Sequence, residues 1–71
     1  MEKTTSDLVK IIEAGGSLVI EAERSTSDLI KLAQTANRVG TRLVLRKVSK
    51  TTLDVIMIAR AGGSNVILEL E

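Results

Sequence analysis

The sequence predicts a parallel α/β fold of three helix–strand repeats, in a single domain that covers residues 1–71. A hydroxyl residue followed three positions later by Asp recurs three times. Each occurrence is followed by helically spaced apolar residues and then by a glycine that leads into a short apolar strand. These features divide the chain into repeats 4–24, 25–50 and 51–71. Helices that alternate with strands favour parallel pairing through right-handed crossovers. We therefore expect a solenoid-like αβαβαβ arrangement with all helices on one face of the sheet.

Each predicted helix begins at a capping pattern, with Thr4, Ser25 and Thr51 as the N-cap residues. The cap hydroxyl can accept from the amide three residues later, and the acid at that position can reach back to the cap amide. The acids, which also complement the helix dipole, are Asp7, Asp28 and Asp54. Because extra residues occur around 36–39, we expect the middle helix to be the longest. The pairs Gly15-Gly16 and Gly62-Gly63 precede strands, so we interpret them as helix stops rather than phosphate-binding loops.

The predicted strands cover residues 18–23, 43–48 and 66–71. Alternation assigns one set of side chains to the core face: Leu18, Ile20, Ala22, Leu43, Leu45, Lys47, Val66, Leu68 and Leu70. It assigns the other set to an open, half-polar face: Val19, Glu21, Glu23, Val44, Arg46, Val48, Ile67, Glu69 and Glu71. Strand order 1-2-3 places Arg46 between Glu21 and Glu69, so opposite charges face each other across both pairs.

Composition argues against several classes of function. The chain has no His, Cys or aromatic residue, and its net charge is +1. These absences leave no catalytic constellation, no expected metal site or cofactor, and no aromatic platform for nucleic-acid bases. No apolar run reaches the roughly 20 residues that span a bilayer, and the first residues do not form a signal peptide. We therefore expect a cytoplasmic protein that is not an enzyme and binds neither nucleic acid nor membrane.

The repeat follows the pattern [ST]-x-x-D-L-x-K-I-x-x-A-x-G-G-x-x-V-x over residues 4–23, 25–48 and 51–70. It resembles a repeat of small bacterial α/β-repeat proteins that have no assigned role. The resemblance implies a parallel α/β repeat fold and supplies no catalytic residues. The leucine-rich repeat is similar in period, but its signature Asn and leucine spacing are absent here. A designed or simplified protein without biological function is an alternative origin, since six residue types, including Pro, are missing.

The third repeat departs from the other two at the outside of its helix. Ser and Lys occupy two positions in the first two repeats, where the third has Leu53 and Met57, with Ile56 beside them. Leu53 and Met57 are four residues apart and form one apolar stripe. The stripe predicts a subunit interface, because exposed apolar patches on soluble proteins often mark contacts. The alternative is that the third helix turns and buries the stripe within the monomer.

Two further surfaces are candidates. Val19, Val44 and Ile67 are expected to form a row across the open sheet face, either as a dimer contact or simply because β-branched residues favour strands. At the other candidate, a basic residue and hydroxyls lie beside a helix N-terminus, which favours a small anion; these residues are Arg24, Ser25, Lys50 and Thr51. We expect a non-enzymatic module that forms a homo-oligomer, with a dimer favoured, and keep a small anionic-ligand binder as the alternative function.

Overall fold

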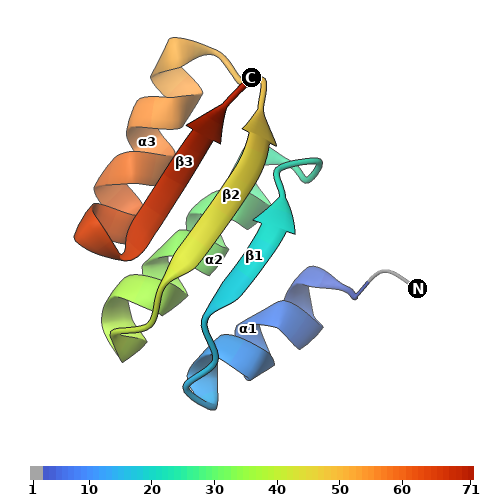
Figure 1. The fold of residues 1–71 in the computed structure, drawn as a ribbon, viewed down its shortest axis with the longest axis vertical. Helices are drawn as coiled ribbons and strands as arrows, with labels where there is room; N and C mark the ends of the chain where they lie inside the picture. The colour runs from blue at the N-terminus through green and yellow to red at the C-terminus, as the bar shows by residue number, and fades with distance from the viewer. Residues whose placement is uncertain (1–2) are drawn as a thin grey trace.

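The computed structural model describes residues 3–71 of the chain. The elements are α1 (Thr5–Glu13), β1 (Leu18–Glu21), α2 (Thr26–Val39), β2 (Leu43–Val48), α3 (Thr52–Gly62), the 3-10 turn η1 (Gly63–Asn65) and β3 (Val66–Leu70). The strands form one parallel sheet in the order β1-β2-β3. The helices lie together behind one face of this sheet (Figure 1). The predicted fold class and strand order are therefore confirmed, and α2 is the longest helix, as expected.

Each helix begins at its predicted cap. The hydroxyl of Thr4 accepts a hydrogen bond from the Asp7 amide over 3.1 Å. Ser25 and Thr51 accept in the same way from the amides three residues later, both over 3.2 Å. The capping box was also predicted to include a return bond from each Asp carboxylate to its own cap amide, and this prediction was wrong for Asp28 and Asp54. The carboxylates of Asp28 and Asp54 accept from threonines of the preceding helix, not from their own cap amides.

The helix ends show that adjacent glycines have different functions. Gly15, Gly40 and Gly63 have φ values of 98°, 90° and 56°, so each adopts a conformation that favours glycine. Gly62 differs, because it is the last residue of α3, lies in the helical region and is buried. A Cβ atom at Gly62 would lie 2.6 Å from Val66 Cγ1. The pair Gly62-Gly63 does end α3, as predicted, with Gly63 as the C-cap, but the small size of Gly62 also serves packing.

An irregularity in β2 changes which side chains face the core. The ladder between β2 and β3 shifts its register between Leu45 and Val48, and Lys47 within the shift has a φ of 55°. The extra residue reverses the alternation at this point. Lys47 is therefore exposed and Val48 is buried, so the predicted assignment of both residues was wrong.

The core lies between the sheet and the helix layer. Its largest fully buried side chains are Ile12, Leu29, Leu32, Leu43, Leu45 and Ile58. Leu70, which alternation assigned to the core, is exposed at the end of the edge strand, so that assignment was wrong. The core is centred on α2 and β2, and the outer elements are covered on one side only (Figure 1).

Candidate interaction surfaces

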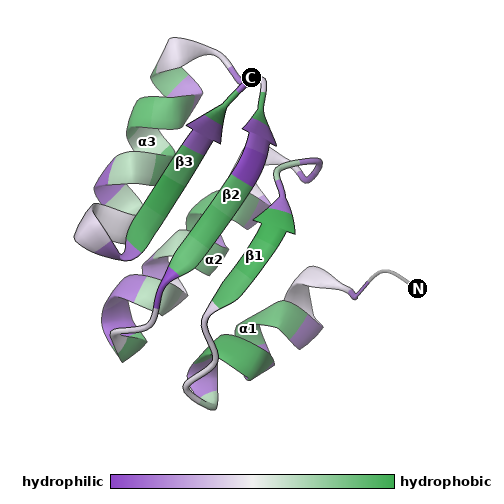
Figure 2. Cartoon of the chain, in the orientation of Figure 1, coloured by the Kyte–Doolittle hydropathy of each residue, from purple (hydrophilic) through white to green (hydrophobic). Residues whose placement is uncertain are grey.

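The outside of α3 carries the predicted apolar stripe. Leu53, Ile56 and Met57 are 67%, 41% and 43% exposed, and Leu70 at the end of β3 is 67% exposed. The four residues are called the α3 patch below. The alternative, in which α3 turns and buries the stripe, does not occur. Figure 2 shows that α3 is largely apolar along its length, whereas hydrophilic residues recur along α2.

The open face of the sheet carries the predicted row of branched side chains. Pairing aligns Val19 with Val44 and Val44 with Ile67. Val19 is 65% exposed and Ile67 is 40% exposed. Parallel sheets are usually covered on both faces, but within residues 3–71 no helix covers this one. The row is apolar, and hydrophilic residues follow it toward the carboxyl ends of β2 and β3 (Figure 2).

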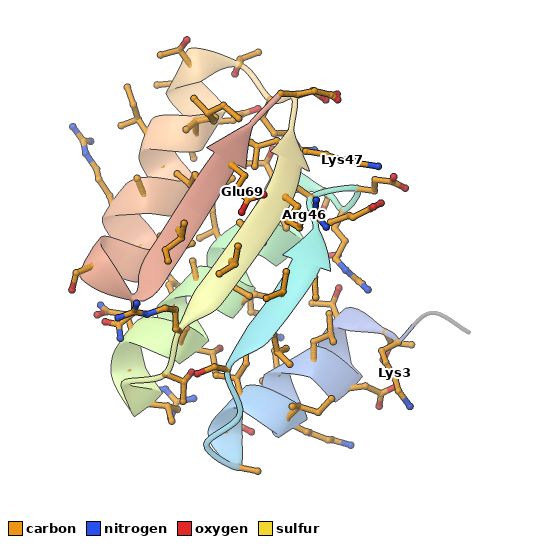
Figure 3. The ribbon with its side chains drawn as sticks, in the orientation of Figure 1. Lys3, Arg46, Lys47 and Glu69 are labelled. Atoms are coloured by element: carbon orange, nitrogen blue, oxygen red, sulfur yellow. The ribbon has the colours of Figure 1, made fainter. Side chains whose placement is uncertain are left out.

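Two ion pairs occupy the carboxyl end of this face. Arg46 Nε donates to Glu69 Oε1 over 3.2 Å, and Figure 3 shows the two side chains together in front of the sheet. Glu21 pairs with Lys47, whose Nζ lies 3.4 Å from Glu21 Oε2. Arg46 therefore joins only one of its two predicted acidic neighbours. A hydrogen bond from Lys47 lowers the pKa of the Glu21 carboxyl below its ordinary value of 4.5.

The predicted anion-binding residues lie at one end of the molecule, but their polar groups make hydrogen bonds within the chain. Arg24 Nη1 donates to Thr5 Oγ1 over 2.9 Å, and Nη2 donates to the Lys3 carbonyl over 2.6 Å. Lys50 Nζ donates to the Arg24 carbonyl over 2.7 Å. The hydroxyls of Ser25 and Thr51 cap helices. Two carboxylates, of Glu23 and Glu71, also line the hollow beside Lys50. This arrangement ties the repeats together and gives an anion little support.

Contacts between neighbouring repeats use side chains that the sequence analysis missed. Thr5 Oγ1 donates to Asp28 Oδ2 over 3.3 Å, and Thr26 Oγ1 donates to Asp54 Oδ2 over 3.2 Å. Each pair joins the first residue of one helix to the third residue of the next. The signal that could have revealed them is the Thr that follows every N-cap residue: Thr5, Thr26 and Thr52.

The described residues contain no cluster of three or more acidic side chains arranged to hold a metal ion. Over the same range of the chain, no helix is long and apolar enough to cross a bilayer. No family model, curated protein or solved structure matches the chain.

Proposed function

We propose that this chain is a non-enzymatic structural module that associates with further copies of itself. The observation that carries the proposal is the α3 patch, in which Leu53, Ile56 and Met57 of α3 lie exposed in the same part of the molecule as Leu70 of β3. Burial of these side chains in an interface would stabilise the complex by about 25 cal/mol for each Å² of apolar surface removed from water.

The repeat itself supports a specific origin for the patch. At the positions of Leu53 and Met57, α1 has Ser6 and Lys10, and α2 carries the same two residue types. The first two helices thus show the chemistry of a solvated face, and the third does not. A chain of 71 residues also has a small core without disulfides, and such domains commonly gain stability from association.

Sedimentation equilibrium over a range of protein concentrations tests the proposal. The wild-type chain is expected to associate. The double variant Leu53→Ser, Met57→Lys, which restores the residues of the other repeats, is expected to associate more weakly while keeping the wild-type circular dichroism spectrum. Ser27→Ala with Lys31→Gln changes the same two positions of α2 and is the matched control. A wild-type chain that remains a monomer at high micromolar concentration would overturn the proposal.

A further inference from the structure

The repeats contact one another through equivalent side chains at both internal junctions. Where α1 meets α2, Thr5 donates to Asp28, and where α2 meets α3, Thr26 donates to Asp54. The side of each helix that carries the Asp therefore faces the preceding repeat and is called the entry face. The side that carries the Thr faces the following repeat and is called the exit face.

Burial shows that the entry face of α1 has no cover among the described residues. Leu32 and Ile58 lie four residues after Asp28 and Asp54, so they share the entry faces of α2 and α3. Both are fully buried. Ile11 holds the same position on α1 and is 37% exposed. Ile11 thus occupies a position that contacts a preceding helix in the other two repeats, but no described helix packs against it on α1.

The exit face of α3 shows the same pattern. Val9 and Ile30 share the exit faces of α1 and α2 and are partly buried against the core. Ile56 holds the equivalent position on α3 and is exposed. The threonines of the exit faces show the same difference in burial, since Thr5 and Thr26 are half-buried whereas the equivalent Thr52 is exposed.

We propose that the exit face of one copy binds the entry face of a second copy, head to tail, so that the junction repeats the contacts inside the chain. The inference rests on the proposed self-association and specifies its geometry. Within the α3 patch, Ile56 and Leu70 would enter the junction, whereas Leu53 and Met57 would lie at its border, since the equivalent Ser27 and Lys31 of α2 are exposed. Thr52 would donate to Asp7 of the second copy, as Thr5 does to Asp28. The apolar contact would join Ile56 to Ile11 of the second copy.

A second set of hydrogen bonds extends in the same direction. Arg24 donates to the Lys3 carbonyl, and Lys50 donates to the Arg24 carbonyl, so each basic residue reaches the equivalent backbone of the preceding repeat. Continuing this set brings Lys3 of the second copy to the Lys50 carbonyl. Figure 3 shows Lys3 at the α1 end of the molecule, with its side chain directed away from the sheet.

The surface shape at the exit face suits a second copy. A hollow of about 350 Å³ lies where α3, the end of β3 and the connection from β2 to α3 meet, and its lining includes Thr52, Val55, Ile56 and Leu70 beside the polar Ser49, Lys50 and Glu71. Three of these side chains are apolar, and Thr52 supplies the hydrogen-bond donor that the proposed junction uses. Packing of a helix against this hollow would cover Ile56 and Leu70 together.

The strand edges also permit the junction. The amides of Leu18 and Ala22 donate to β2, so alternation directs the amides of Val19 and Glu21 away from it, at the open edge of β1. The amide of Glu71 donates to β2, so the Leu68 amide is directed to the open edge of β3 by the same alternation. Pairing Leu68 with Ile20 of the second copy continues the register of the sheet.

Two like-charge contacts oppose the junction. The continued register sets Glu69 against Glu21 and Glu71 against Glu23 of the second copy, and like charges across a strand pair are unfavourable. The cost is moderated because Glu69 already pairs with Arg46, and Glu21 pairs with Lys47. The proposed junction therefore predicts that Glu69→Gln does not weaken association, in contrast to substitutions on either face.

A mixing experiment distinguishes this geometry from a two-fold dimer formed through α3 and β3. Ile11→Lys blocks the entry face and Ile56→Lys blocks the exit face, and both isoleucines are exposed enough to accept a lysine in the folded monomer. Each variant alone should associate at least about tenfold more weakly than wild type, since the junction would bury an unpaired ammonium. Gln34→Lys adds the same charge to the outside of α2 and is the control.

Mixed in equal amounts, the two variants should form a complex of two chains, because each still has one intact face. The head-to-tail proposal is overturned if Ile11→Lys alone associates as strongly as wild type, or if the folded variants do not combine. A monomeric wild type would instead overturn the self-association on which this geometry rests, so the two failures are separable.

Amide hydrogen exchange on the wild type gives a readout that needs no variant. Comparison of dilute with concentrated protein should show increased protection of Val19 and Glu21 in β1 and of Leu68 in β3. Protection at Leu68 alone would indicate a two-fold contact through β3 and would contradict the head-to-tail arrangement.

Discussion

Gly62→Ala is expected to destabilise the protein, although alanine usually stabilises a helix. Gly62 has φ −92° and ψ −22°, which alanine adopts without strain, so propensity alone predicts a gain of about 1 kcal/mol. Packing predicts the opposite result. The new Cβ would lie 2.6 Å and 2.7 Å from two Val66 side-chain carbons and 3.2 Å from Ala33 Cβ.

Because Gly62 joins α3 to the turn before β3, relief of this overlap requires a shift of that connection. Overpacking of this kind costs about 1–3 kcal/mol, which leaves a net loss of roughly 0–2 kcal/mol after the propensity gain. A loss of 1 kcal/mol corresponds to about 4–8 °C in Tm for a domain of this size. Thermal unfolding followed by circular dichroism at one fixed protein concentration measures the change.

Gly40 provides the matched control, because a Cβ there would meet nothing within 4 Å. Its φ of 90° makes Gly40→Ala unfavourable for conformational reasons alone, by about 1–2 kcal/mol. Gly40→Asn should recover part of this loss because Asn tolerates the left-handed region, whereas Gly62→Asn should lose more than Gly62→Ala. A Gly62→Ala variant with a raised Tm would refute the packing argument.

Three other substitutions test individual contacts. The carboxyl of Glu21 has a lowered pKa in the folded state, so the ionised carboxylate stabilises the fold above the unfolded pKa, and this stabilisation is lost as pH falls below 4.5. Lys47→Met should make stability depend less on pH in this range. Urea unfolding between pH 3 and 6 measures the difference between the variant and the wild type. Thr26→Val removes the hydrogen bond to Asp54 and should cost about 0.5–1.5 kcal/mol, with less effect when Asp54 is already Ala in a double-mutant cycle. Thr41 Oγ1 is buried without a hydrogen-bond partner among the described residues, so Thr41→Val should raise stability by up to about 1 kcal/mol; a lower midpoint in chemical unfolding would contradict this assignment.

The candidate surfaces could be predicted only in part. Leu53 and Met57 were identifiable because they break a repeat that is visible in the sequence, and the structure exposes both. Ile11 was not identifiable, since its helix pattern is the same as that of the buried Leu32 and Ile58. Its exposure depends on whether another helix packs beside α1, and no local pattern records this.

The bulge at Lys47 could not be predicted either, because it depends on contacts with other elements. Strict alternation places Lys47 inside and Val48 outside, and no glycine or asparagine marks the position with φ 55°. The structure favours the irregular backbone because it places Val48 in the core and the lysine ammonium beside Glu21. This gain involves side chains of β1 and of the core, so the sequence of β2 alone does not reveal it.

The sequence by itself determined where the helices begin and where the strands lie, and its charge pattern favoured the order in which the strands pair. Caps, glycine conformations and apolar periodicity act over a few residues, so the chain displays them directly. Only the tertiary structure decided the partners of Asp28 and Asp54, the requirement for a small residue at Gly62 and the uncovered faces of α1 and α3. These features depend on atoms that packing brings together from separate elements; Thr5 and Asp28, for example, are 23 residues apart.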